Sequence, residues 1–200
     1  VMEAARRAEE AGRHVIHMEV GQPGTPAPEA ARAALIAEMA AGPLGYTVAL
    51  GRPDLRARIA RLYGDWYGVD LDPARVVVTS GSSAGFILAF TALFDAGARV
   101  ALAEPGYPSY RHILKALSLQ AVGLPTTEAA RFQPVPEDIL SRPGLDGIIV
   151  ASPSNPTGTM LDHGALAGLI GAAEQTATAF VSDEIYHGIQ YEGRAVSALE

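Results

Sequence analysis

The sequence has no cysteine and a single lysine, Lys115, among its 200 residues. The lack of cysteine excludes disulfides, thiolate metal sites and cysteine nucleophiles. No apolar run approaches the roughly 18 residues that a membrane span needs, so we expect no membrane segment. Basic residues are few and scattered in a chain with a formal charge of -7, which does not predict nucleic-acid binding. The five histidines lack the spacing of a metal site.

The remaining composition is that of a globular protein. Hydrophobic residues make up 48% of the chain and the mean hydropathy is +0.15, values that argue against a disordered polypeptide. A length of 200 residues suits one good-sized core, or one domain and part of another. Charged residues such as Glu3 and Arg6 interrupt the start of the chain, where a signal peptide would be apolar. We therefore expect a cytoplasmic protein.

The order of the expected elements predicts an α/β fold. After a mostly helical beginning, short β-branched runs alternate with helical patterns, which is typical of a three-layer, mostly parallel, doubly wound sheet. The stretch 126–142 is the least regular and is expected on the surface. The expected helices are 2–12, 28–41, 53–67, 84–94, 108–117 and 163–174, and the expected strands are 15–20, 76–78, 100–102, 120–124, 148–151 and 179–182.

The small residues Gly81, Ser82 and Ser83 lie between an expected strand and an expected helix. Such residues let the backbone approach a ligand, and the first N–H groups of a helix, with two hydroxyls beside them, suit a phosphate. The glycine spacing is not that of a dinucleotide fingerprint, and no Walker motif follows. An ordinary helix N-cap in a tight turn would explain the same residues.

Three more chemically active positions follow expected strands. Tyr107, Asn155 and Asp183 each come just after one, and Tyr186 lies three residues beyond Asp183. The carboxyl ends of parallel strands form the edge where ligands of open α/β sheets bind. An amide and a phenol suit a phenolic oxygen, a carboxylate suits a pyridine nitrogen, and a tyrosine ring stacks on a planar group. Together they predict pyridoxal phosphate as cofactor. Singly, packing explains the tyrosines, a turn explains Asn155 and a helix cap explains Asp183.

In their order along the chain these motifs resemble those of class I/II aminotransferases, the fold-type I pyridoxal phosphate enzymes, in the aspartate aminotransferase-like branch. The resemblance covers essentially the whole chain. It rests on Gly-Gln-Pro at 21–23, Tyr46-Thr47 with Gly51, Gly81-Ser82-Ser83, Glu104-Pro105-Gly106-Tyr107-Pro108-Ser109-Tyr110, Asn155-Pro156-Thr157-Gly158 and Asp183-Glu184-Ile185-Tyr186.

The resemblance implies a role at the cofactor for each matched position. The loop Gly81–Ser83 would bind its phosphate, and Tyr107 would stack on its ring. Asn155 and Tyr186 would hydrogen-bond the ring oxygen, and Asp183 would pair with the ring nitrogen.

The resemblance also implies what lies around the cofactor. Tyr46 would reach the phosphate in a neighbouring subunit of a homodimer, and Gly21 would lie beside the substrate carboxylate. The lysine that forms a Schiff base in the family would follow the Asp-Glu-Ile-Tyr motif by a few tens of residues, beyond Glu200. Lys115 precedes that motif, so no catalytic residue is expected within the chain itself.

The implied function is a pyridoxal phosphate-dependent transaminase that acts on an amino acid and a 2-oxo acid. Residues 1–24 would be an amino-terminal arm or part of a small domain, and 25–200 an incomplete cofactor-binding large domain. Two alternatives use the same cofactor cradle: a carbon–sulfur lyase or other α,β-eliminating enzyme, and the effector domain of a transcription regulator. The regulator would need a basic helix-turn-helix before Val1.

Overall fold

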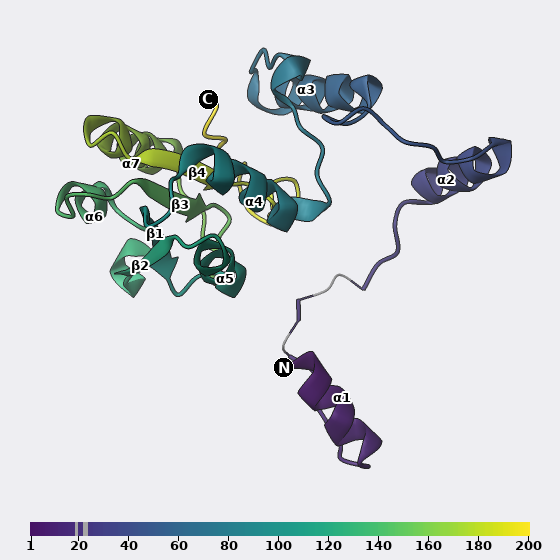
Figure 1. Cartoon of the computed structure of the whole chain (residues 1–200), viewed down its shortest axis with the longest axis horizontal. Helices are drawn as coiled ribbons and strands as arrows, with labels where there is room; N and C mark the ends of the chain where they lie inside the picture. Colours follow the sequence, from purple (N-terminus) through teal and green to yellow (C-terminus); the bar gives the residue numbers. More distant parts are fainter. Residues whose placement is uncertain (19, 22–23) are drawn as a thin grey trace. The chain divides into compact units, whose positions relative to one another are not determined.

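Figure 1 shows the computed structural model of the chain, which describes residues 1–18, 20–21 and 24–200. Two compact units are present, Val1–Tyr46 and Thr47–Glu200. The first contains helices α1 (Met2–Glu10) and α2 (Glu29–Ala41), neither of which has a buried residue. The assignment of residues 1–24 to an arm or small domain stays a prediction.

One expectation for the first unit is wrong and another falls outside the described residues. Residues 15–18 and 20 do not form the expected strand, because a strand needs a neighbour to pair its backbone groups and the sheet of this protein is built from the second unit. The Gly-Gln-Pro motif at 21–23 includes Gln22 and Pro23, which lie outside the described part of the chain.

The second unit is built on a four-stranded sheet with the order β2-β1-β3-β4. All of its neighbouring strands are parallel, which confirms the predicted fold class. The apolar residues of β1 and β3 are buried on both faces, as is usual for central parallel strands. The strands are β1 (Arg99–Glu104), β2 (Gln120–Pro125), β3 (Gly147–Ala151) and β4 (Ala179–Asp183).

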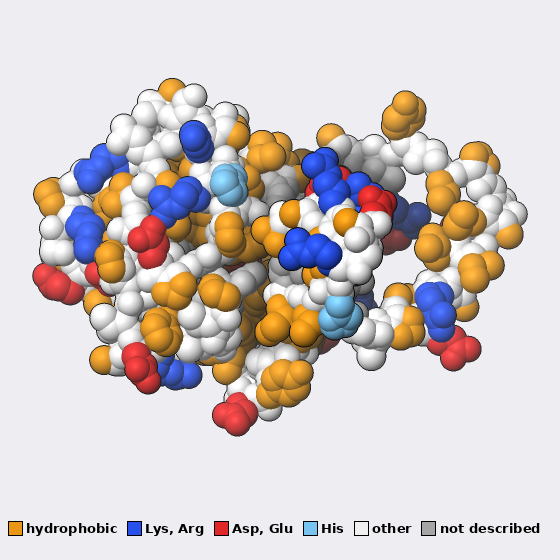
Figure 2. All heavy atoms as spheres, turned by 90° about the horizontal axis from the view of Figure 1, so that it is seen from below, with side chains coloured by type: hydrophobic (Ala, Val, Ile, Leu, Met, Phe, Trp, Pro, Cys, Tyr) orange, Lys and Arg blue, Asp and Glu red, His pale blue; other side chains and the backbone are white. Residues whose placement is uncertain are grey.

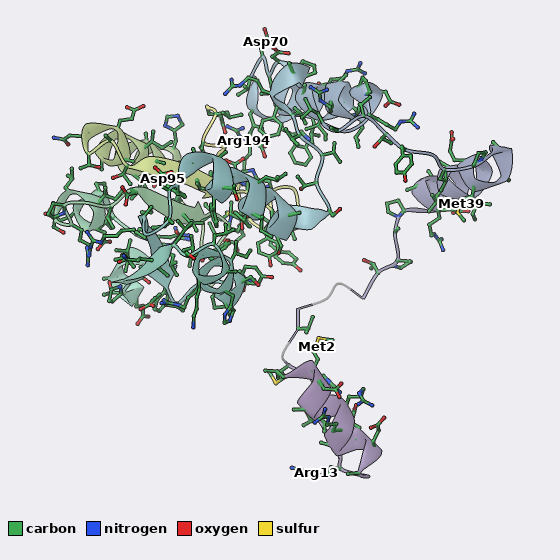
Figure 3. All side chains as sticks on the ribbon, viewed as in Figure 1. Met2, Arg13, Met39, Asp70, Asp95 and Arg194 are labelled. Atoms are coloured by element: carbon green, nitrogen blue, oxygen red, sulfur yellow. The ribbon has the colours of Figure 1, made fainter. Side chains whose placement is uncertain are left out.

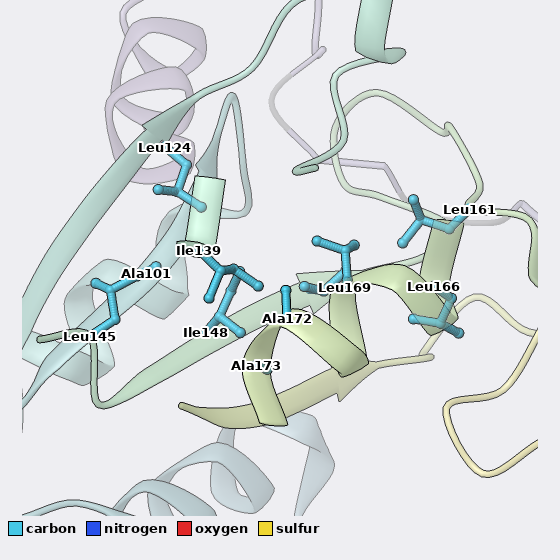
Figure 4. Close-up of a cluster of buried hydrophobic side chains, with 11 residues drawn as sticks. Ala101, Leu124, Ile139, Leu145, Ile148, Leu161, Leu166, Leu169, Ala172 and Ala173 are labelled. Atoms are coloured by element: carbon cyan, nitrogen blue, oxygen red, sulfur yellow. The ribbon is translucent and has the colours of Figure 1, made fainter. Parts of the chain in front are cut away.

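Helices cover both faces of this sheet and complete the three layers. Val100 of β1 belongs to a core with α4 and α5, and Ala101 belongs to a core with α6 and α7, because successive strand residues point to opposite faces. Figure 4 shows Leu169 and Ala172 of α7 against Ile148 of β3. The helices of this unit are α3 (Pro53–Tyr67), η1 (Pro73–Arg75), α4 (Gly81–Leu93), α5 (Pro108–Ala116), η2 (Glu128–Ala130), α6 (Pro136–Leu140) and α7 (His163–Gln175).

Two expectations for the second unit are wrong. Residues 76–78 have a strand-like sequence but remain irregular, and the N–H of Val78 donates to the carbonyl of Leu50 at 3.0 Å instead of to a strand. The stretch 126–142 is not merely a surface segment, because it includes α6 and buries Gln133 and Ile139, which are 4% and 1% exposed.

The surface carries charges of both signs. On the face seen in Figure 2, Lys and Arg side chains lie among Asp and Glu and do not form one basic patch. None of the helices in the described ranges is long and apolar enough to cross a bilayer.

Candidate functional site

The sheet topology defines an edge at which a ligand can bind. The chain continues from β1 to β2 on one side of β1, whereas β3 pairs on its other side. The direction of the connections therefore reverses between β1 and β3, and ligands of open α/β sheets bind at such a reversal, beyond the carboxyl ends of the strands. Tyr107, Asn155 and Asp183 follow or end β1, β3 and β4 at this edge.

Asn155 and Tyr186 are in contact at this edge. The Asn155 amide nitrogen donates to the Tyr186 hydroxyl at 3.3 Å. The loop that carries Asn155 is closed by two backbone bonds, from Ser154 N–H to the Thr159 carbonyl at 3.0 Å and from Gly158 N–H to the Ser154 carbonyl at 2.7 Å. Two side chains that the sequence predicts to share a ligand oxygen are thus brought together from different strand ends.

The side-chain amide of Gln133 holds this loop in place, a role that was not predicted from the sequence. Its buried amide donates to the carbonyl of Ala151 at 3.2 Å and to that of Thr159 at 2.9 Å. It therefore joins the end of β3 to the far side of the Asn155 loop. No sequence signal marks Gln133, because its importance comes from contacts 18 and 26 positions away.

Asp183 is a buried carboxylate, 8% exposed, with a donor at each oxygen. The Tyr110 hydroxyl donates to Oδ2, and the N–H of Ile185 donates to Oδ1 at 3.1 Å. Burial, followed by the bond to Asp183, raises the pKa of Tyr110 above its usual range, so the phenol stays a donor. Residues 185–188 form a turn and not a helix, and the interpretation of Asp183 as a helix cap is therefore wrong.

Tyr107 packs against Tyr110, the residue whose hydroxyl donates to Asp183. Its ring lies edge-on to that of Tyr110, with centroids 5.4 Å apart, and Tyr110 lies edge-on to Phe86 at 5.2 Å. Tyr110 was not singled out from the sequence, although a second tyrosine one helical turn after Tyr107 was a signal that the two rings share a face.

The first turn of α4 presents two exposed serine hydroxyls, while the N–H of Gly81 donates to the Thr79 carbonyl at 2.9 Å. Gly81 has φ +78, and a side chain there would meet no atom within 4 Å. Ser82 and Ser83 are exposed, and the Ser80 side chain makes no capping bond to the helix. The alternative of a side-chain N-cap is therefore not realised in the structure.

The candidate residues line two separate hollows of the second unit. Ser82 and Asp183 line one of about 670 Å³, and Asn155 and Tyr186 line one of about 470 Å³. Tyr46 and Gly21 belong to the first unit, and both are exposed. No group of three acidic or histidine side chains suited to a metal ion occurs within the described ranges.

The donor set fits pyridoxal phosphate. Helix N–H groups and serine hydroxyls suit its phosphate. The amide of Asn155 and the phenol of Tyr186 suit an anionic ring oxygen, and the carboxylate of Asp183 suits a protonated ring nitrogen. The phosphate, the ring oxygen and the ring nitrogen of the cofactor each have a counterpart of matching chemistry at the same sheet edge.

The family model described as aminotransferase class I and II matches residues 13–199. The chain belongs to this family.

Known relatives agree with this assignment. Valine–pyruvate aminotransferase of Mycobacterium tuberculosis is 46% identical over 180 residues, 90% of this chain and 46% of that protein. Aspartate aminotransferase of Pyrococcus horikoshii is 30% identical over 89% of this chain and 46% of its own length. The solved structure of alanine aminotransferase from Pyrococcus furiosus matches with a TM-score of 0.92 at 31% identity, covering 99% of this chain and 52% of that one. The chain spans about half the length of these relatives.

Proposed function

We propose that the protein carrying this chain moves an amino group from an amino acid to a 2-oxo acid, with pyridoxal phosphate as its cofactor. The observation that carries the proposal is the family match over residues 13–199, together with a sheet edge whose polar groups suit the phosphate, the ring oxygen and the ring nitrogen of that cofactor. The named relatives are aminotransferases, which favours amino-group transfer over a lyase or an effector domain. We keep the cytoplasm as the expected compartment.

The residues of the chain would divide the work of holding the cofactor. When bound, pyridoxal phosphate supplies the carbon that takes up the amino group and a ring that withdraws electrons. The first turn of α4 would hold its phosphate and Tyr107 would cover one ring face. Asn155 and Tyr186 would donate to the ring oxygen. Asp183, oriented by its donor Tyr110, would hold the proton on the ring nitrogen.

Turnover assays would test this function directly. The full-length protein that carries this chain is purified, loaded with pyridoxal phosphate and incubated with valine and pyruvate, chosen because the valine–pyruvate relative is 46% identical. Other amino acid and 2-oxo acid pairs follow. We expect one amino acid to be formed for each one consumed. Release of ammonia and pyruvate from a β-substituted amino acid, without transfer, would instead favour the eliminating enzyme.

We also propose a homodimer in which Tyr46 reaches the phosphate bound by the neighbouring subunit, Gly21 lies beside the substrate carboxylate, and the Schiff-base lysine follows Glu200. Tyr46 is exposed in a loop, as a residue meant for another subunit would be. Tyr46→Phe should weaken cofactor retention. Mixing it with Asp183→Ala subunits should restore some active sites. A monomer in sedimentation and no restored activity would contradict the shared site.

A further inference from the structure

His187 connects three segments that meet at the candidate site. It follows Tyr186 directly, and its side chain is 6% exposed. Nδ1 lies 2.5 Å from the hydroxyl of Tyr67 in α3, and Nε2 lies 2.9 Å from the carbonyl of Ser152, the first residue after β3. Both ring nitrogens therefore have a partner, and neither partner belongs to the turn that carries the histidine.

The partners determine where the ring proton resides. A backbone carbonyl only accepts hydrogen bonds, so Nε2 must carry a hydrogen when it faces Ser152, whether the ring is neutral or protonated. The Tyr67 hydroxyl can donate to a bare Nδ1 or accept from a protonated one. The Ser152 bond is therefore compatible with both charge states, whereas the Tyr67 bond would change direction between them.

The charged groups around the ring are compatible with this arrangement. Glu184 Oε2 lies 3.7 Å from Nδ1, and the guanidinium of Arg194, labelled in Figure 3, lies 5.6 Å from the Tyr67 ring centroid. Burial, followed by the nearby Glu184 charge, raises the pKa of Tyr67 to about 12. The phenol thus stays protonated near neutral pH and can donate to Nδ1.

The Ser152 bond connects the backbones that carry Asn155 and Tyr186. Ser152 N–H donates to the Asp183 carbonyl at 3.1 Å, while the Ser152 carbonyl accepts from His187. Ser152, at the start of the Asn155 loop, is therefore bonded through both its N–H and its carbonyl to the segment 183–187, which carries Tyr186. A shift of Ser152 would change the 3.3 Å contact between Asn155 and Tyr186.

We propose that His187 is a positioning residue for the Asn155–Tyr186 pair and acts through its Nε2–H bond to the Ser152 carbonyl. The inference rests on the proposed function in one respect, that the ligand of this pair is the ring oxygen of pyridoxal phosphate. A ring that merely filled the space between α3 and the sheet edge would contribute to stability and would not set this contact.

Three substitutions of His187 distinguish the contribution of the Nε2 hydrogen bond from that of the Nδ1 hydrogen bond. In His187→Gln the amide nitrogen can take the place of Nε2 and donate to Ser152. In His187→Asn the amide reaches only the place of Nδ1, and His187→Phe keeps a ring but has neither group. Tyr67→Phe is the matched control, because it removes the hydrogen bond to α3 and leaves the Ser152 bond in place.

The first measurement needs no cofactor. In ¹⁵N NMR of the purified protein between pH 5 and 9, Nε2 should stay protonated throughout. The side-chain amide signal of Asn155 should move in His187→Asn and His187→Phe and stay near its wild-type position in His187→Gln and Tyr67→Phe. A neutral ring protonated at Nδ1, or an Asn155 signal that is the same in all variants, would overturn the inference.

The second measurement is the affinity for pyridoxal phosphate, followed by its visible absorbance, with the melting temperature recorded in parallel. We expect His187→Asn and His187→Phe to weaken cofactor binding about 10-fold, the effect of one lost hydrogen bond. The affinities of His187→Gln and Tyr67→Phe should stay within about threefold of the wild-type value. Affinities that follow the melting temperatures instead of this order would contradict positioning. Failure of the wild-type protein to bind the cofactor would refute the proposed function, while the NMR result would still test His187.

Discussion

Asp183 is a buried carboxylate whose two oxygens accept hydrogen bonds from a buried phenol and from the backbone of the following turn. These donors fix the orientation of the carboxylate before any ligand is present. The same geometry would serve a purely structural polar pair, so the chemical role of Asp183 needs a substitution that changes charge with little change in shape.

We predict that Asp183→Asn in the loaded enzyme lowers turnover on the order of 100-fold and leaves the cofactor content nearly unchanged. The reason is that Asp183 would act on the electronics of the ring, whereas α4 would anchor the phosphate. Turnover and bound cofactor are measured on the same preparation. Asp162→Ala is the control, because Asp162 accepts from Ala165 N–H at 2.8 Å as the cap of α7 and should cost about 1 kcal/mol of stability. An Asp183→Asn enzyme that is less stable yet fully active would remove the proposed role.

Tyr110→Phe tests the hydrogen bond that the Tyr110 hydroxyl donates to Asp183. The change removes a donor to a buried carboxylate and should lower the free energy of unfolding by about 1.5–3 kcal/mol. Denaturant unfolding measures it, and Tyr191→Phe, at a fully exposed position, should change stability by less than about 0.5 kcal/mol.

The Tyr110 prediction has a pH dependence with a definite sign. Because the fold raises the pKa of Tyr110, the unfolded chain loses this proton first as the pH rises. The contribution is therefore complete below the unfolded value of about 10 and is lost progressively above it. The difference between wild type and Tyr110→Phe should shrink in alkaline solution, and a constant difference would contradict the assignment.

Single residues also show how far the sequence alone could go. Asn155 and Tyr186 were predicted to share a ligand oxygen because each follows a strand-like run, and the structure brings them into contact. Tyr110, Gln133 and His187 were given no role. The partner of Tyr110 lies 73 positions away, those of Gln133 lie 18 and 26 positions away, and those of His187 lie 35 and 120 positions away. No local sequence pattern predicts contacts at such separations.

At the scale of elements, the connection from β1 to α5 is sterically tight. A side chain at Gly106 would place its Cβ 2.4 Å from the carbonyl oxygen of Ala103, a backbone atom that cannot move aside without distorting the end of β1. Gly106 also immediately precedes Tyr107. The turn that presents this tyrosine to the site therefore depends on the absence of a side chain.

We predict that Gly106→Ala destabilises the protein by about 1–3 kcal/mol, measured by denaturant unfolding. Gly171→Ala is the matched control. Gly171 lies inside α7 with no atom within 4 Å of a Cβ, so alanine there should stabilise the helix by about 0.5–1 kcal/mol. Equal effects at the two positions would show that the crowding at Gly106 is relieved at little cost.

Elements were predicted well where burial determines the sequence pattern. The centre of β1 (Val100–Leu102) and of β3 (Ile148–Val150) reads as a continuous apolar run, because helices cover both faces of the sheet. The run at 76–78 has the same appearance yet does not join the sheet. Pairing requires a neighbouring strand, and a neighbour is not a property of the segment itself.

At the scale of the whole molecule, the position of Lys115 bears on activity. α5 begins at the carboxyl edge of the sheet and runs back along it, so Lys115 in its last turn lies toward the opposite edge and is exposed. We predict that the 200-residue chain expressed by itself has no transaminase activity. Borohydride treatment with pyridoxal phosphate, followed by mass spectrometry, should not label Lys115 stoichiometrically. Stoichiometric labelling together with turnover would refute this.

The all-parallel sheet has a consequence for how the protein is made. The bonds that build the site join residues 31, 35, 73 and 120 positions apart, and contacts of such separation form late because long loops must close first. The contacts of Tyr110 with Asp183 and of Asn155 with Tyr186 cannot form on a growing chain until β4 has joined β3. A ligand that binds only the finished site adds about 2.7 kcal/mol of stability at 100 times its dissociation constant. The supply of cofactor in the cell would therefore govern how much newly synthesised chain escapes degradation, as well as how much of it is active.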